Sequence, residues 1–189
     1  EYCSKTLEKA VASFSKVQIA NSIFQIVCGM RYLHFKKIIH RDLKPSNVLV
    51  VEDGTIKISD FDISKMMDLN EQTMMTGGVG TLFFMAPEIL NNDPKYTEKV
   101  DVYSFAVLTY FILSQGKMPK TTNAQISLGK KPNIPETFTE FAKKMIDECW
   151  NFDPKKRPSF DQIYAQLVDN CSKLVKMSSE QQRKVKTQV

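Results

Sequence analysis

Apolar positions in the first third of the chain follow two different spacings. Steps of three and four residues across 19–33 predict an amphipathic helix that ends before the Lys36-Lys37 pair. Further on, the β-prone runs 48–51 and 55–58 are separated by a Glu-Asp-Gly turn, which predicts a short hairpin. The helix therefore leads the chain towards the polar segment that precedes the hairpin.

From residue 87 onwards the pattern is helical. The segment 100–115 predicts a helix that is closed by Gly116. Its most apolar stretch, 102–113, is too short and too polar to span a bilayer, so we expect it to be buried in the core. Residues 138–150 predict another helix, and Ser159 is the expected cap of the last one. The sequence thus predicts an α+β fold that is mainly α-helical.

Composition and charge indicate an ordinary globular domain. The chain has 189 residues, of which 42% are hydrophobic and 25% are charged, so one core is expected. Most of the net charge of +5 arises in residues 172–189, which carry five basic side chains and one acidic one; without them 21 basic residues face 20 acidic ones. We interpret 172–189 as a basic polar tail, frayed or partly helical, and expect no nucleic-acid partner.

The four cysteines, Cys3, Cys28, Cys149 and Cys171, lie far apart in the sequence. Their spacing matches neither a metal site nor a disulfide framework, so buried thiols in a cytoplasmic protein are expected.

Candidate chemistry begins with His-Arg-Asp-Leu-Lys-Pro-Ser-Asn at 40–47. The carboxylate of Asp42 could orient a hydroxyl group and accept its proton, while Lys44 places a positive charge on a transferring phosphoryl group. Asn47 offers an amide oxygen and Asp60 offers a carboxylate to Mg²⁺, which prefers oxygen ligands. These four side chains predict one site for phosphoryl transfer.

The chain resembles the C-terminal lobe of a eukaryotic protein kinase. The resemblance rests on residues 40–47, on Asp-Phe-Asp at 60–62 and on Ala-Pro-Glu at 86–88. It implies a kinase domain over 1–171, ATP and Mg²⁺ as cofactors, and a protein Ser or Thr hydroxyl as the acceptor. The glycine-rich loop and lysine of an N-terminal lobe are absent from this sequence, so we expect residues 1–189 alone to be inactive.

The same resemblance assigns nucleotide contacts. The backbone of Glu1 and Cys3 would meet the adenine edge at the hinge, Leu49 would pack under the adenine, and Lys44 would face the phosphates. A frayed terminus is the alternative for the first two residues, and core packing is compatible with the role of Leu49.

The resemblance also implies supporting roles. Glu88 and Arg157 would form a buried ion pair, and Asp101 would brace the backbone of the catalytic loop. His40 would stack on Phe61, as a structural histidine and not an acid or base.

Local sequence refines the substrate class. Lys44, together with Gly-Thr at 80–81, resembles serine/threonine kinases, and 101–105 and 149–160 resemble the tyrosine-kinase-like group of these enzymes. A small-molecule phosphotransferase is disfavoured because the Ala-Pro-Glu segment and the helices after it build a platform for peptides.

One position departs from the kinase pattern: Asp62 stands where the family has glycine. This substitution keeps open the alternative of a pseudokinase or docking module. Arg41 suggests control by phosphorylation, with Thr73 and Thr76 as candidate sites, although loop hydroxyls are mostly only solvated.

Overall fold

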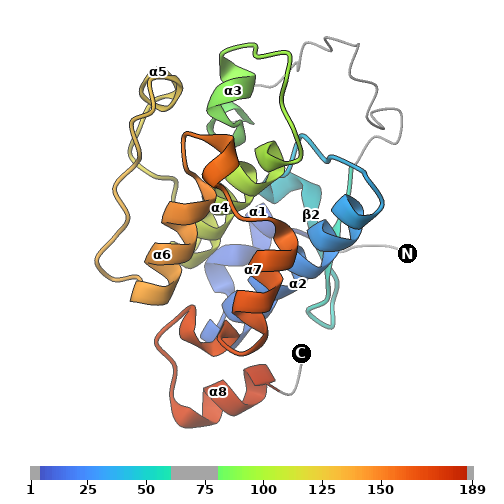
Figure 1. Cartoon of the computed structure of the whole chain (residues 1–189). Coiled ribbons are helices and arrows are strands. Elements are labelled where there is room, and N and C mark those ends of the chain that lie inside the picture. Colours follow the sequence, from blue (N-terminus) through green and yellow to red (C-terminus); the bar gives the residue numbers. More distant parts are fainter. Residues whose placement is uncertain (1–4, 61–80, 187–189) are drawn as a thin grey trace.

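The computed structural model describes residues 5–60 and 81–186. Figure 1 shows their arrangement. The strands are β1 (Lys5–Thr6), β2 (Val48–Val50) and β3 (Ile56–Ile58), and the α-helices are α1 (Leu7–Ala10), α2 (Lys16–Phe35), α3 (Pro87–Leu90), α4 (Lys99–Leu113), α5 (Asn123–Ser127), α6 (Glu140–Cys149), α7 (Phe160–Val168) and α8 (Ser179–Lys186). Short 3-10 helices are η1 (Val11–Ser13), η2 (Pro45–Asn47), η4 (Thr81–Phe84), η5 (Pro154–Lys156) and η6 (Cys171–Lys173).

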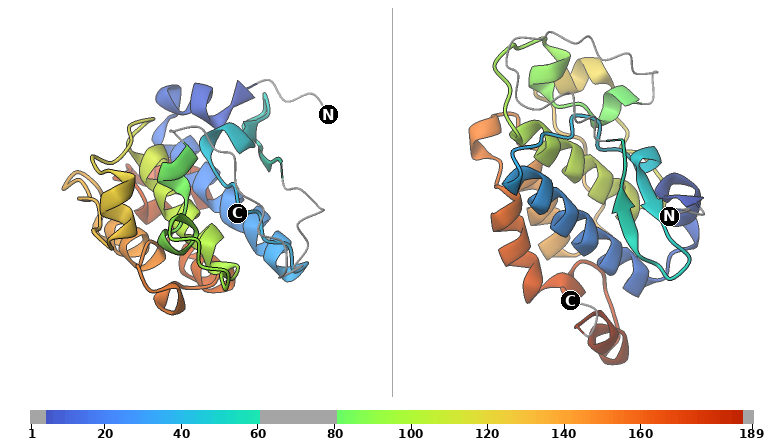
Figure 2. Two further views of the ribbon diagram at one scale, coloured as in Figure 1. Left: turned by 90° about the horizontal axis from the view of Figure 1, so that it is seen from above. Right: turned by 90° about the vertical axis from the view of Figure 1, so that its right-hand side faces the viewer.

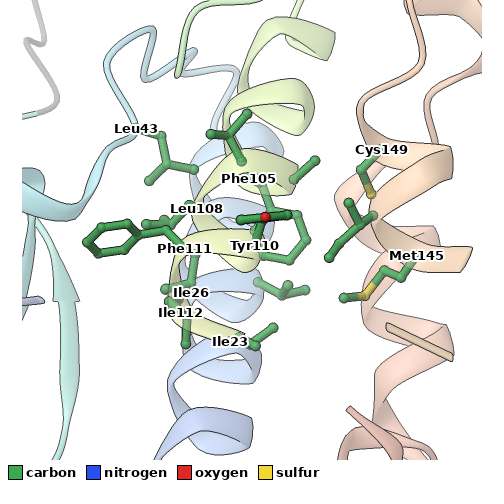
Figure 3. Packing of buried hydrophobic residues seen from close by; sticks show 14 of the residues in the cluster. Ile23, Ile26, Leu43, Phe105, Leu108, Tyr110, Phe111, Ile112, Met145 and Cys149 are labelled. Carbon is green, nitrogen blue, oxygen red and sulfur yellow. The ribbon is translucent and has the colours of Figure 1, made fainter. Parts of the chain in front are cut away.

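Helix α4 is the centre of the core. Every residue from Val100 to Ile112 is buried, as expected for a helix that is apolar on all sides. Side chains of α4 such as Phe105 and Ile112 pack between those of α2 and α6 (Figure 3). Within the described part of the chain, no helix has the length and apolarity needed to cross a membrane.

The ends of the helices follow the predicted signals. Ser159 caps α7 by accepting a hydrogen bond from the Gln162 backbone N–H at 3.2 Å, and the Gln162 side chain bonds back to the Ser159 N–H. Helix α4 stops two residues earlier than the segment 100–115, because Gln115 and Gly116 both adopt positive φ. The N–H of Gly116 then satisfies the Phe111 carbonyl at 2.9 Å.

The predicted hairpin forms, with β2 antiparallel to β3 and Gly54 at φ +86° in the turn. Strand β1 adds a third strand by pairing with β2, which the sequence analysis did not predict because two residues carry no strand pattern. The sheet lies along α2 (Figure 2), where Gly29 lets Ile58 approach the helix closely. Helix α2 therefore supports the sheet and also residues 36–47, which connect α2 to β2.

The segment after α7 packs against the helices. Leu174 and Val185 are fully buried, and the Thr139 hydroxyl donates to the Lys173 carbonyl at 2.7 Å. The Cys171 thiol donates to the Ala20 carbonyl in α2 at 3.4 Å, and burial raises its pKa to about 12. Figure 1 shows α8 at the end of the molecule opposite α3. The segment interpreted as a polar tail thus contains a helix and two core residues.

Candidate active site

The catalytic loop, residues 40–47, lies between α2 and β2 and gathers three of the predicted side chains. The Lys44 ammonium lies 2.8 Å from Oδ2 of Asp42. The Asn47 side-chain N–H donates to the same oxygen and to the Asp42 carbonyl, both at 2.9 Å. Leu43 is fully buried and anchors the loop in the core (Figure 3). Asp42, Lys44 and Asn47 therefore form one cluster.

This arrangement leaves the two carboxylate oxygens of Asp42 in different states. Oδ2 accepts from both Lys44 and Asn47, whereas no donor to Oδ1 is found among the side chains described within residues 5–60 and 82–186. A carboxylate with one oxygen held and the other available can orient a hydroxyl group and accept its proton. The side chain of Asp42 is 30% exposed, so the carboxylate group can be reached from solvent.

Asp60 is linked to the cluster through Ser59. The Ser59 backbone N–H and hydroxyl both donate to the Asn47 carbonyl, at 2.9 and 3.2 Å. The same hydroxyl lies 3.2 Å from Oδ2 of Asp60, whose residue is exposed. Ser59 was not a candidate in the sequence analysis, yet it joins the end of β3 to the catalytic loop.

The donor set of Asn47 and Asp60 fits a magnesium ion. Because the Asn47 nitrogen faces Asp42, its oxygen Oδ1 faces away, and among the described residues only the Ser46 hydroxyl donates to it, at 3.3 Å. One amide oxygen and one carboxylate suit a hard cation that keeps waters and phosphate oxygens as its other ligands. No group of three or more His, Cys, Asp or Glu side chains that could hold a metal ion is found among the described residues.

Asp101 braces the catalytic loop, as predicted. Its buried carboxylate accepts the backbone N–H of His40 at 2.9 Å and that of Arg41 at 2.8 Å. Arg41 has φ +68° and Asp60 has φ +59°, a region that side chains with a Cβ rarely adopt. Strained backbone of this kind is common at functional sites and needs support from its surroundings, which Asp101 supplies for Arg41.

His40 is packed within this network. Its side chain accepts the Asp42 N–H at Nδ1, 3.3 Å away, so Nε2 carries the proton and donates to the Ser59 carbonyl at 3.0 Å. The residue is 1% exposed. These contacts agree with a structural histidine, one that connects the catalytic loop to the segment leading to Asp60.

Leu49 occupies the outer face of β2. Its neighbours Val48 and Val50 pack on the core, and side chains alternate along a strand, so Leu49 points to the opposite face and is half-buried. This placement suits a contact with a ligand above the sheet. Several other predicted residues lie outside the described ranges: Glu1, Cys3, Phe61, Asp62, Thr73 and Thr76.

The Glu88–Arg157 ion pair connects α3 with the segment between η5 and α7. Both terminal nitrogens of the Arg157 guanidinium donate to the Glu88 carboxylate, Nη1 to Oε1 at 2.6 Å and Nη2 to Oε2 at 2.8 Å. The remaining donors of Arg157 bond to backbone carbonyls, so all five N–H groups are used. Burial raises the pKa of the neighbouring Tyr103 to about 12, which keeps that hydroxyl neutral.

A comparison of the whole sequence with known protein families identifies the family of the chain. The sequence model of the protein kinase domain matches residues 1–168. The chain belongs to the protein kinase family. The mainly helical fold with a small antiparallel sheet is that of part of a kinase domain, so the predicted fold class is confirmed.

Kinases from distant organisms resemble this kinase domain. Identity is 40% over 149 residues with mitogen-activated protein kinase kinase kinase 12 of Rattus norvegicus, covering 75% of this chain and 16% of that protein. It is 41% over 149 residues with mitogen-activated protein kinase kinase kinase 13-A of Xenopus laevis, covering 75% and 15%. Dual specificity protein kinase shkB of Dictyostelium discoideum is 35% identical over 150 residues, covering 75% and 23%. The chain thus spans less than a quarter of each relative's length.

Proposed function

We propose that this chain is the catalytic lobe of a serine/threonine protein kinase, which transfers the γ-phosphate of ATP to a Ser or Thr hydroxyl of a protein. The observation that carries the proposal is the Asp42 carboxylate, held at Oδ2 by Lys44 and Asn47 with Oδ1 available to an acceptor hydroxyl. The family membership of the chain supports the same reaction class.

Each side chain then has a distinct task. Asp42 orients the acceptor hydroxyl and takes its proton, while Lys44, 2.8 Å away, offers positive charge to the transferring group. Asn47 and Asp60 would hold the magnesium ion through oxygen atoms. Bound Mg²⁺-ATP supplies the phosphoryl group and the metal charge that offsets the charge of the phosphates.

The acceptor class and the location of the protein are part of the proposal. Lys44 favours a serine/threonine kinase, and residues 101–105 and 149–160 favour the tyrosine-kinase-like group. Two of the relatives are named as mitogen-activated protein kinase kinase kinases. The name of shkB makes tyrosine acceptors worth testing alongside. A cytoplasmic location is favoured by Cys28, Cys149 and Cys171, which are all free thiols.

The test is phosphate transfer by the purified full-length protein. With radiolabelled ATP and Mg²⁺ we expect phosphate on Ser/Thr peptides and not on tyrosine peptides, and loss of transfer when EDTA removes the metal. Asp42→Asn should lower kcat by about 10²–10⁴-fold, the usual contribution of a general base. Asp147→Asn is the matched control, because Asp147 is also paired with a lysine but lies on an exposed surface; its kcat should not change.

The alternative is a pseudokinase or docking module, motivated by Asp62 in the metal-binding segment. Such a protein would give no transfer above the Asp42→Asn background, even if it bound Mg²⁺-ATP. Restoring glycine at position 62 is the sharper arm: a gain in kcat would show that Asp62 slows turnover. We further propose that residues 1–189 on their own are inactive, and peptide phosphorylation by this fragment would contradict that.

A further inference from the structure

The outer face of α2 exposes apolar side chains. Cys28, Tyr32 and Phe35 lie on one face of this helix, and Tyr32 and Phe35 are 60% and 75% exposed. Together with Arg31 and with Asp161 of α7, they line a groove of about 210 Å³, the α2–α7 groove. We propose that this groove binds an acidic segment of a partner protein that carries an apolar side chain. The inference does not depend on the proposed transfer reaction.

The groove is held in place on both sides. On one side Arg31 lies 2.6 Å from Asp161 and 4.3 Å from the ring centroid of Tyr164, both in α7. On the other side α2 contacts β3, where Ile58 packs against Gly29. Figure 2 (right) shows this face of α2 at the surface, with α7 and the hairpin on either side. Because the walls exist before a ligand binds, little order has to be created on binding.

Exposed apolar surface is concentrated at the groove. Among the described residues five large apolar side chains are exposed, and two of them, Tyr32 and Phe35, are one helical turn apart. Single exposed apolar residues are ordinary on a protein surface, whereas adjacent ones indicate a contact surface. The volume of the groove lies below the range of about 300–1,000 Å³ that is typical of small-molecule pockets, so the groove suits a single apolar side chain.

Cations flank the two exposed rings. The Lys36 ammonium lies 5.6 Å from the ring centroid of Tyr32 and 5.5 Å from that of Phe35, and Lys37 is exposed beside it. Neither lysine has a carboxylate partner within the described part of the chain, and Asp161 is already paired with Arg31. The groove therefore has a positive rim, which attracts acidic side chains and repels basic ones.

The backbone of Lys37 supports a role for its charge. Lys37 has φ +61°, a region that favours glycine, and its N–H donates to the His34 carbonyl at 3.0 Å where α2 ends. A lysine in this conformation costs energy that glycine would not cost. Contact between its ammonium and an acidic ligand gives the residue a function that offsets this cost.

The shape of the groove favours a protein segment over a membrane. Aromatic rings and lysines also occur on surfaces that bind anionic lipids, but such binding uses clusters of about four to eight basic residues. Here two lysines border a concave site that the Arg31–Asp161 pair closes at one edge. A peptide can place one side chain in such a site and its carboxylates at the rim.

Fluorescence polarisation with the full-length protein tests the proposal. The probe is the fluorescein-labelled peptide EDELFDELED, which is acidic and has apolar residues at its centre. One comparator, EDESSDESED, lacks the apolar residues, and the other, KKKLFKKLKK, has the opposite charge. We expect saturable binding of the probe and at least about tenfold weaker binding of each comparator, because each lacks one part of the recognition.

The apolar contact is tested by Phe35→Ser. It should weaken binding of the probe by about tenfold or more, as expected for an aromatic residue at the centre of a contact. Leu128→Ser is the matched control, because Leu128 is 85% exposed and does not line the groove. Its affinity for the probe should not change.

The charged rim is tested by the double variant Lys36→Glu/Lys37→Glu. Binding should weaken by about tenfold at low salt, and the difference should shrink at about 1 M salt, which screens charges. Lys155→Glu/Lys156→Glu changes the net charge by the same amount at an exposed lysine pair in η5, so it should leave binding unchanged.

Alkylation of Cys28 places the peptide in the groove. Cys28 lines the groove and is partly exposed, whereas Cys149 and Cys171 are buried. Bound probe should therefore slow the modification of Cys28 by N-ethylmaleimide, followed by mass spectrometry.

Four outcomes would overturn the inference: no binding of the probe by the full-length protein, equal binding of the comparators, unchanged binding in Phe35→Ser, or binding only to phosphatidylserine vesicles. None of these measurements needs phosphate transfer. A protein that binds the probe but phosphorylates no peptide would therefore refute the proposed function alone.

Discussion

The catalytic loop and the helices that pack around α4, called the helical base from here on, are held together by different interactions. In the loop, polar groups hold one another: Asp42, Lys44 and Asn47 are linked by charge and hydrogen bonds, and Arg41 adopts a strained backbone. In the base, α4 is buried over Val100–Ile112 and packs against apolar side chains (Figure 3). The two regions meet at Asp101, a carboxylate inside the most buried helix.

This difference indicates where stability and chemistry reside. Burial of apolar surface stabilises the base, and the base then supplies a rigid frame from which a few polar anchors position the loop. Substitutions in the base should therefore lower the free energy of unfolding while leaving kcat unchanged below the unfolding temperature. Stability is measured by urea unfolding of residues 1–189, with the fluorescence of Trp150 as the probe. The value of kcat is measured on the full-length protein.

Arg157→Met should have the largest effect on stability. It leaves the buried Glu88 carboxylate without its partner, and breaking a buried ion pair in this way costs about 3–5 kcal/mol. Urea unfolding should show this loss. The double variant Glu88→Leu/Arg157→Met, which leaves no unpaired charge, should recover a large part of it.

The matched control for this prediction is Arg31→Met. The Arg31–Asp161 pair also has a short distance, 2.6 Å, but its side chains are 45% and 75% exposed. Water screens such a pair, so its loss should lower the free energy of unfolding much less than loss of the buried pair does. Equal losses in the two arginine variants would show that burial of the Glu88–Arg157 pair is not what matters.

Leu174→Ala should have the next largest effect and tests whether the base extends past α7. Leu174 is fully buried in the segment that follows the family match at residue 168, and removal of a buried leucine side chain costs about 2–5 kcal/mol. Val168→Ala is the control, because Val168 is among the exposed apolar residues. A change below about 0.5 kcal/mol in Leu174→Ala would mean that this segment is not part of the cooperative unit.

The sequence predicted the helices of the base better than the segments that pack against them. The three- and four-residue spacing of apolar positions identified α2, and Ser159 and Gly116 marked helix ends, because these signals are local. Strand β1 and the burial of Leu174 and Val185 could not be foreseen. A two-residue strand has no period, and two apolar residues in a polar segment do not reveal which helix they will meet.

The site divides in the same way. Asp42, Lys44 and Asn47 lie within six residues, so their spacing in a known motif was enough to bring them together. His34 and Ser59 were missed, because the bond from His34 to Asp101 joins residues 67 positions apart and the role of Ser59 depends on how β3 meets the loop. Polar partners across the fold leave no pattern along the chain.

Ser159→Ala should have a smaller effect, since it removes one cap. Loss of a serine cap costs about 0.5–2 kcal/mol, and Ser159→Asp, which keeps an acceptor oxygen, should retain stability. Ser127→Ala removes a hydroxyl that bonds only within its own exposed turn, so it should change stability by less than about 0.5 kcal/mol. If kcat falls in Ser159→Ala although the protein is folded, α7 influences the loop more strongly than the separation of base and loop allows.

Gly29→Ala should have the smallest net effect on stability, because a gain in helix propensity and a loss from overpacking nearly cancel where α2 contacts β3. Alanine favours a helix over glycine by about 1 kcal/mol, but its Cβ would lie 2.8 Å from Cδ1 of Ile58. Overpacking costs about 1–3 kcal/mol, and Cδ1 is the flexible end of its side chain, so a cost near the lower limit and a net loss of about 1 kcal/mol or less are expected. Ile58→Val removes Cδ1, and in that background Gly29→Ala should instead stabilise the protein by up to about 1 kcal/mol. The change of sign in urea unfolding is the measurement that decides. The same effect in both backgrounds would mean that Ile58 does not limit how closely the strand approaches α2, and that β3, which leads to Ser59 and Asp60, is set in place by other contacts.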